Sequence, residues 1–172
     1  MGLIFYEKRD YFILRDEEND YSNECSAHEG KTNKAPNPRF NQNLCERFLV
    51  EKKIGIYDIA KRVIRQQGNA SDNFLDIVEP VNLPDLLDQI PDCQVVAATG
   101  QKSLETIVSV LKSQNPNLTV PGLDQYQPFE NHGRALILYR LPSTSRAYPK
   151  PLEKKAQSYQ RLIELLTNRF QE

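Results

Sequence analysis

The chain lacks the features that mark membrane-spanning and secreted proteins. Its 172 residues contain no apolar run approaching ~18 residues, so no transmembrane helix is predicted. Met1 is not followed by the basic and then apolar leader of a secretory signal. Hydrophobic residues make up 39% and charged residues 26%, which is ordinary for a globular protein with a core and argues against a disordered chain. Without an internal repeat, we expect a single cytoplasmic domain over residues 1–172 that needs no membrane and acts as a monomer.

Cysteine is also scarce. Cys25, Cys45 and Cys93 are odd in number and widely spaced, which favours reduced thiols over a disulfide framework. The two histidines, His28 and His132, do not complete a paired set of zinc ligands. We therefore expect neither a metal nor another cofactor.

A net charge of −1 hides an uneven distribution along the chain. From Arg134 onward there are eight lysines and arginines against three glutamates, a formal charge of +5, so the first 133 residues carry −6. A basic C-terminal quarter is suited to a phosphate-bearing partner such as DNA, because neutralising backbone phosphates supplies most nonspecific affinity. A solvated helix face explains part of this charge equally well.

The hydrophobic pattern predicts helices and strands that alternate over the last two thirds of the chain. Leu104, Ile107, Val108 and Leu111 have the spacing of one helical face. The remaining predictions are helices near 44–53, 82–90 and 152–166, and strands at 54–59, 94–98 and 135–140. The short apolar runs read as buried strands, so we predict a three-layer α/β/α fold with a short, mainly parallel sheet.

The first part of the chain is less regular. Residues 3–6 and 11–14 are apolar runs that suit either a hairpin or the end of a helix and a turn. Residues 17–43 are polar, with Pro36 and Pro38, and predict a surface loop or insertion.

Three bends follow predicted strands, and ligands gather at the carboxyl ends of parallel strands. Asp58 ends the first of these strands, and Thr99 and Gly100 end the second. The third bend combines short hydroxyl donors, a stiff proline and a planar cation suited to phosphate oxygens. Its residues are Pro142, Ser143, Thr144, Ser145 and Arg146. Each bend alone is also ordinary cap or turn chemistry, so the prediction of a phosphate site depends on their meeting at one edge of the sheet.

The order of these segments resembles the uracil-DNA glycosylase superfamily, in particular a bacterial branch of it. The similar segments are Gly55–Asp58, Gly68–Asp72, Val95–Gly100 and Leu141–Tyr148. The resemblance implies base excision repair, in which the bond between a flipped base such as uracil and its sugar is hydrolysed. It also implies that Asp58, Thr99 and Gly100 bind the base. Residues 142–146 would then hold the DNA phosphates.

Two features depart from that family. Its first motif, a Gly- and Pro-containing loop that positions the attacking water, has no counterpart here, and Leu141 stands where better-known branches have a histidine donor. Either Met1 is an internal methionine of a longer protein, or residues 3–14 supply replacement strands. No catalytic residue is identified, and we expect little or no base excision by this chain.

Two other readings remain open. The scaffold could act as a noncatalytic module that binds DNA or another phosphate ligand. Alternatively, the chain could be an unrelated α/β enzyme that handles a nucleotide or a phosphorylated metabolite at the same edge.

Overall fold

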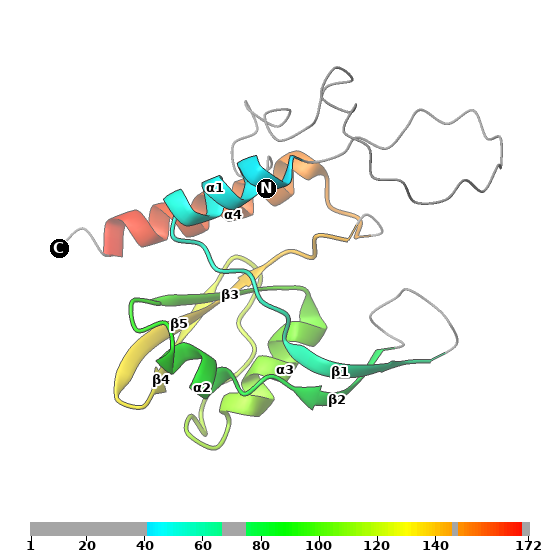
Figure 1. The fold of residues 1–172 in the computed structure, drawn as a ribbon, viewed down its shortest axis with the longest axis vertical. Coiled ribbons are helices and arrows are strands. Elements are labelled where there is room, and N and C mark those ends of the chain that lie inside the picture. Colours follow the sequence, from blue (N-terminus) through cyan, green and yellow to red (C-terminus); the bar gives the residue numbers. More distant parts are fainter. Residues whose placement is uncertain (1–40, 67–74, 146–147, 170–172) are drawn as a thin grey trace. The chain divides into compact units, whose positions relative to one another are not determined.

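The structure is a computed structural model that describes residues 41–66, 75–145 and 148–169 (Figure 1). The chain divides into two compact units, Met1–Ile56 and Tyr57–Glu172. The apolar runs at residues 3–6 and 11–14, predicted as a hairpin or as the end of a helix and a turn, lie outside the described residues, and so does most of the predicted loop at 17–43. Only the end of that loop is described, and there Gln42 and Asn43 already belong to a helix.

Within the first unit, the described residues form helix α1, Gln42–Glu51. Asn41 caps it, because its side-chain oxygen accepts a hydrogen bond from the Leu44 amide at 3.1 Å. The helix ends before Lys53, whose φ of 51° lies in the left-handed region. The helix predicted near residues 44–53 is therefore confirmed.

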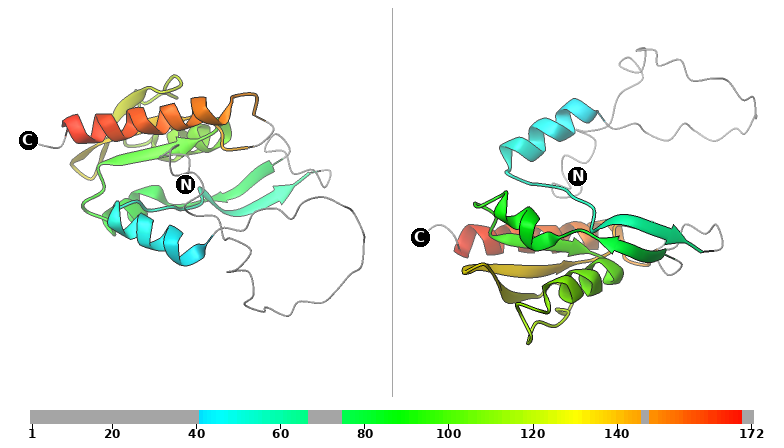
Figure 2. Two further views of the ribbon diagram at one scale, coloured as in Figure 1. Left: turned by 90° about the horizontal axis from the view of Figure 1, so that it is seen from above. Right: turned by 60° about the horizontal axis from the view of Figure 1, so that its bottom comes forward.

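The second unit is built around a three-stranded sheet with the order β3-β5-β4 (Figures 1 and 2). Its strands are β3, Val95–Thr99, β4, Tyr126–Asn131, and β5, Arg134–Leu141. β3 is parallel to β5, whereas β4 is antiparallel to β5 and joined to it by the turn at His132 and Gly133. The predicted strands at 94–98 and 135–140 are confirmed, while β4 was not foreseen.

One face of this sheet carries the main core. Helices α2, Leu83–Asp88, and α3, Gln101–Leu111, cover it. Leu104, Ile107 and Leu111 are buried, as their helical spacing predicts. They pack with Leu136 and Leu138 of β5, and Leu138 is fully buried. Burial of this apolar area holds α3, which follows β3 in the chain, against this face of the sheet.

Alternate residues of β5 point to the other face, as the pleat of a strand requires. Ile137 and Tyr139 are almost fully buried there. Helix α4, Leu152–Arg169, packs against β5, and its Arg161 lies close enough to Tyr139 to influence the tyrosine electrostatically. The helix predicted over 152–166 is confirmed.

A separate two-stranded antiparallel sheet contains β1, Ala60–Arg65, and β2, Leu75–Pro80 (Figures 1 and 2). Most of its side chains are exposed. The prediction of a buried strand at residues 54–59 is wrong: these residues form no strand, and Ile56 and Tyr57 are largely exposed. A short apolar run does not by itself supply a partner strand, and pairing starts only at Ala60.

The fold is mixed α/β. The prediction of a mainly parallel sheet is wrong for the described strands, because β3–β5 is their one parallel pair and β4–β5 and β1–β2 are antiparallel. Antiparallel pairs need only a short turn, as at His132 and Gly133, whereas a parallel pair needs a crossover such as α3.

Candidate phosphate-binding site

The parallel pairing of β3 and β5 brings two of the three predicted bends together. Thr99 is the register partner of Leu141, so Gly100 and Pro142 begin neighbouring loops at one end of the sheet. A Cβ atom added to Gly100 would lie 4.0 Å from the Cβ of Ser143. Segments more than 40 residues apart in the sequence thus form one edge, which we call the β3–β5 rim: Thr99, Gly100 and residues 142–145.

The first side of the rim is the N-terminus of α3. Gly100 precedes the helix with a φ of 91°, a conformation that side chains rarely adopt, and it provides no side-chain cap. The Ser103 hydroxyl donates to the Thr99 carbonyl at 2.8 Å and lies 4.0 Å from the position of a Cβ atom added to Gly100. Uncapped amides at a helix N-terminus favour an anion.

The second side is the hydroxyl loop after β5. Pro142 is buried and anchors the loop, Ser143 is half-buried, and Thr144 and Ser145 are exposed. The Ser143 hydroxyl oxygen accepts a hydrogen bond from the Ser145 amide at 3.2 Å, which makes a local serine turn. Because a hydroxyl can accept and donate at once, Ser143 keeps its proton for a ligand. Arg146, predicted as the cation of this loop, lies outside the described residues.

Helix α4 and Lys150, which precedes it, supply positive charge behind the loop. The Lys155 ammonium donates to the Ser145 carbonyl at 2.7 Å, and the Lys150 ammonium donates to the Ser158 hydroxyl at 3.1 Å. One carboxylate offsets part of this charge: Asp124 lies 2.7 Å from the Arg161 guanidinium and 3.9 Å from Lys150. The three cations and one carboxylate leave the α4 side of the loop positive.

The third predicted bend is not built as expected. Asp58 is exposed and lies before β1, at the start of the two-stranded sheet, rather than at the carboxyl end of a parallel strand. Asp58 was expected at the rim because a strand was predicted at residues 54–59, and that prediction is wrong. The structure therefore gives no sheet-edge reason for Asp58 to meet Ser143, and its role in binding a base stays a prediction.

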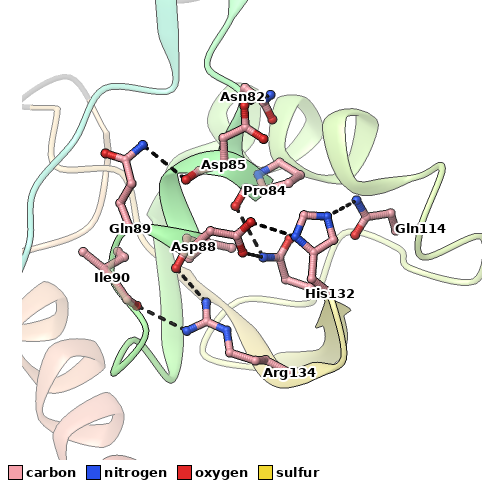
Figure 3. A network of polar contacts seen from close by, with 11 residues as sticks. Asn82, Pro84, Asp85, Asp88, Gln89, Ile90, Gln114, His132 and Arg134 are labelled. Atoms are coloured by element: carbon pink, nitrogen blue, oxygen red, sulfur yellow. Dashed lines mark hydrogen bonds and ion pairs between the residues drawn. The ribbon is translucent and has the colours of Figure 1, made fainter.

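Sequence reasoning missed a polar cluster at the opposite end of β5, which Figure 3 shows. Asp88 of α2 accepts from the Asn131 side-chain amide at 3.0 Å, and Nδ1 of His132 lies 2.8 Å from the same carboxylate. Gln114 lies 3.3 Å from the other ring nitrogen. The residues come from three separate parts of the chain, and no local motif could have revealed them.

Arg134 closes this cluster (Figure 3). Its guanidinium donates to the carbonyls of Leu87, Ile90 and Pro91, at and just beyond the end of α2. Carbonyls at a helix C-terminus lack partners within the helix, so this contact satisfies them. The cluster fastens α2 to the β4–β5 turn, and these contacts between protein groups account for the geometry of the turn without a ligand.

Other expectations concern thiols, metals and membranes. Cys45 and Cys93 are free thiols, as predicted, and Cys25 lies outside the described residues. Among the described ranges, no three His, Cys, Asp or Glu side chains gather in a way that could hold a metal ion. No helix in the part of the chain that the structure describes is long and apolar enough to cross a membrane.

Comparison with protein-family models, curated proteins and solved structures found no match to this chain. The resemblance to uracil-DNA glycosylases therefore stays a prediction from the sequence.

Proposed function

We propose that the β3–β5 rim binds the phosphates of a nucleic-acid strand, with DNA as the partner. The observation that carries the proposal is the juxtaposition of the uncapped α3 N-terminus with Ser143, 4.0 Å from the Cβ position of Gly100. Backbone amides, a hydroxyl donor and nearby cations are the groups that hold phosphate oxygens in proteins. The basic charge of residues 134–172 supplies attraction over a longer range.

Base excision is a narrower proposal on the same rim. Its support is the order β3, α3, β5 and hydroxyl loop, which agrees with the order of the glycosylase-like segments. This narrower proposal includes the three-layer α/β/α scaffold of that family. Cleavage of a base-to-sugar bond places negative charge on the departing base, and fixed donors at the rim would stabilise it. Because no water-activating group is identified, release of uracil from a uracil-containing oligonucleotide is expected to be slight or absent.

Direct binding tests the main proposal. A fluorescent oligonucleotide, single-stranded or duplex, is titrated with the protein while its anisotropy is followed. We expect binding that weakens steeply between about 50 and 200 mM salt, because phosphate contacts release counterions. Ser143→Ala should weaken binding by about 10-fold or more, because it removes one hydrogen bond to a charged group, worth about 1.5–3 kcal/mol. Ser109→Ala, on the exposed side of α3, is the control and should leave binding unchanged.

Several results would count against it. Absence of DNA binding at low salt overturns the proposal, and equal effects of the two serine substitutions remove the rim as its site. Tight binding of a mononucleotide without affinity for DNA would instead favour an enzyme of small phosphorylated compounds.

Gly100 offers a second test with a matched control. Both Gly100 and Gly133 have positive φ, 91° and 82°, and an added methyl group has no close contact at either position. Gly100→Ala and Gly133→Ala should therefore both destabilise the fold through backbone strain, by about 1–3 kcal/mol. Only Gly100→Ala should also weaken DNA binding, because only Gly100 sets the direction of the α3 amides at the rim. Equal binding by both variants at a temperature where both are folded would contradict this assignment.

A further inference from the structure

Among the lysines that the structure describes, Lys155 is the one that is buried. The residue is 6% exposed, whereas its neighbour Lys154 is exposed. Its ammonium donates to the Ser145 carbonyl at 2.7 Å and lies 5.5 Å from the centre of the Tyr148 ring. Within the described ranges it forms no ion pair with a carboxylate, whereas the partly exposed Lys150 has Asp124 at 3.9 Å.

A buried ammonium without a carboxylate costs free energy, so proteins seldom bury a lysine that is not paired. A carbonyl and an aromatic face compensate part of that cost through their partial charges. They leave the formal positive charge in place. An anion bound nearby would complete the compensation.

The Lys155 ammonium is linked to the β3–β5 rim by consecutive contacts. The Ser145 carbonyl that it binds also accepts the Tyr148 amide at 3.2 Å, and the Ser145 amide donates to the Ser143 hydroxyl at 3.2 Å. Ser143 in turn lies beside Gly100. Lys155 therefore holds the carbonyl group of Ser145, and the amide group of the same Ser145 orients the Ser143 hydroxyl.

We propose that Lys155 is the positioning residue of the phosphate site, holding the hydroxyl loop in its binding conformation and supplying the charge that a bound phosphate neutralises. This inference rests on the proposed function of the rim. From the sequence alone, Lys155 is only one of several cations on a predicted helix. If Lys155 is merely a structural tie between the loop and α4, its charge has no bearing on ligand binding.

Three variants separate these roles. Lys155→Met keeps the length of the side chain and removes its charge, Lys155→Arg keeps the charge, and Lys154→Met removes the same charge from an exposed site one residue away. DNA affinity is measured by anisotropy at several salt concentrations, with circular dichroism to verify folding. We expect Lys155→Met to weaken binding at least about 10-fold, Lys155→Arg to recover it to within about 3-fold, and Lys154→Met to change it less than about 3-fold.

The outcomes are distinguishable. If the unsubstituted protein does not bind DNA, the proposed function fails and the role of Lys155 fails with it. If it binds DNA but Lys155→Met and Lys154→Met behave alike, the role of Lys155 alone is overturned. If Lys155→Met does not fold, the side-chain ammonium signals of the unsubstituted protein decide by nuclear magnetic resonance. The Lys155 signal should shift when a short oligonucleotide is added, and an unchanged signal under saturating conditions overturns the inference.

Discussion

The contact between Asp124 and Arg161 offers the sharpest test of how α4 is held against the sheet. Asp124 lies just before β4, with a φ of 58° and a side chain that is 13% exposed, and its carboxylate is 2.7 Å from the Arg161 guanidinium. Asp124→Asn keeps the side-chain shape and a residue type that tolerates positive φ, so the substitution removes mainly the charge.

The expected cost follows from this geometry. A hydrogen bond between charged groups contributes about 1.5–3 kcal/mol, but the Arg161 side chain is 59% exposed and solvent screens it. We therefore expect Asp124→Asn to lower the free energy of unfolding by about 1 kcal/mol. For a unit of this size, that corresponds to a decrease in Tm of roughly 3–6 °C.

A double-mutant cycle isolates the pair. Asp124→Asn, Arg161→Met and the double variant are compared by urea unfolding followed by circular dichroism, and the coupling energy should be about 1 kcal/mol. The control cycle uses Arg62 and Glu79 of the two-stranded sheet, which are 4.0 Å apart and 68% and 50% exposed. Their coupling should be below about 0.5 kcal/mol. The reasoning is refuted if the two cycles give the same coupling.

Three further outcomes follow from burial. Leu138→Ala should lower the free energy of unfolding by about 2–5 kcal/mol, measured in urea, because it leaves a cavity at a fully buried position. Burial raises the pKa of Tyr139 and Tyr159 in the folded protein, so the unfolded chain loses these phenolic protons at a lower pH. The free energy of unfolding should therefore fall as the pH rises above about 10. Replacing both tyrosines by phenylalanine should flatten this decline in alkaline unfolding curves. Burial also raises the pKa of the Cys93 thiol, so iodoacetamide at pH 8 should modify it more slowly than free N-acetylcysteine, as followed by peptide mass mapping, and equal rates would contradict its burial.

Helix positions were predictable because their signals are local. The four-residue apolar face of α3 and the Pro84 near the start of α2 act within one or two turns, and the structure confirms both helices. Two strands were predictable from short apolar runs: β5, which is buried on both faces, and β3, which is partly buried beside it. The β4 strand, which contains Pro128, was missed, since proline argues against a strand except at an edge, and β4 is an edge of the described sheet.

Half of the candidate site depended on chain order. The expectation that β3 and β5 are parallel placed Thr99, Gly100 and Ser143 at the same edge of the sheet, and the direct pairing of the two strands makes them neighbours there. Asp58 illustrates the limit of this reasoning, because an apolar run predicts a strand without naming its partner, and residues 54–59 found none.

The sequence by itself determined which stretches become helices, where the hydroxyl loop stands and that residues 134–172 are basic. These properties depend on neighbours in the chain, so they are written locally. Only the tertiary structure decided that Lys155, and not Lys154, turns inward beneath the loop, and that Asp124 meets Arg161 across 37 residues. Such contacts depend on how a helix rotates against a sheet, and that rotation is fixed by packing of the whole core rather than by any short segment.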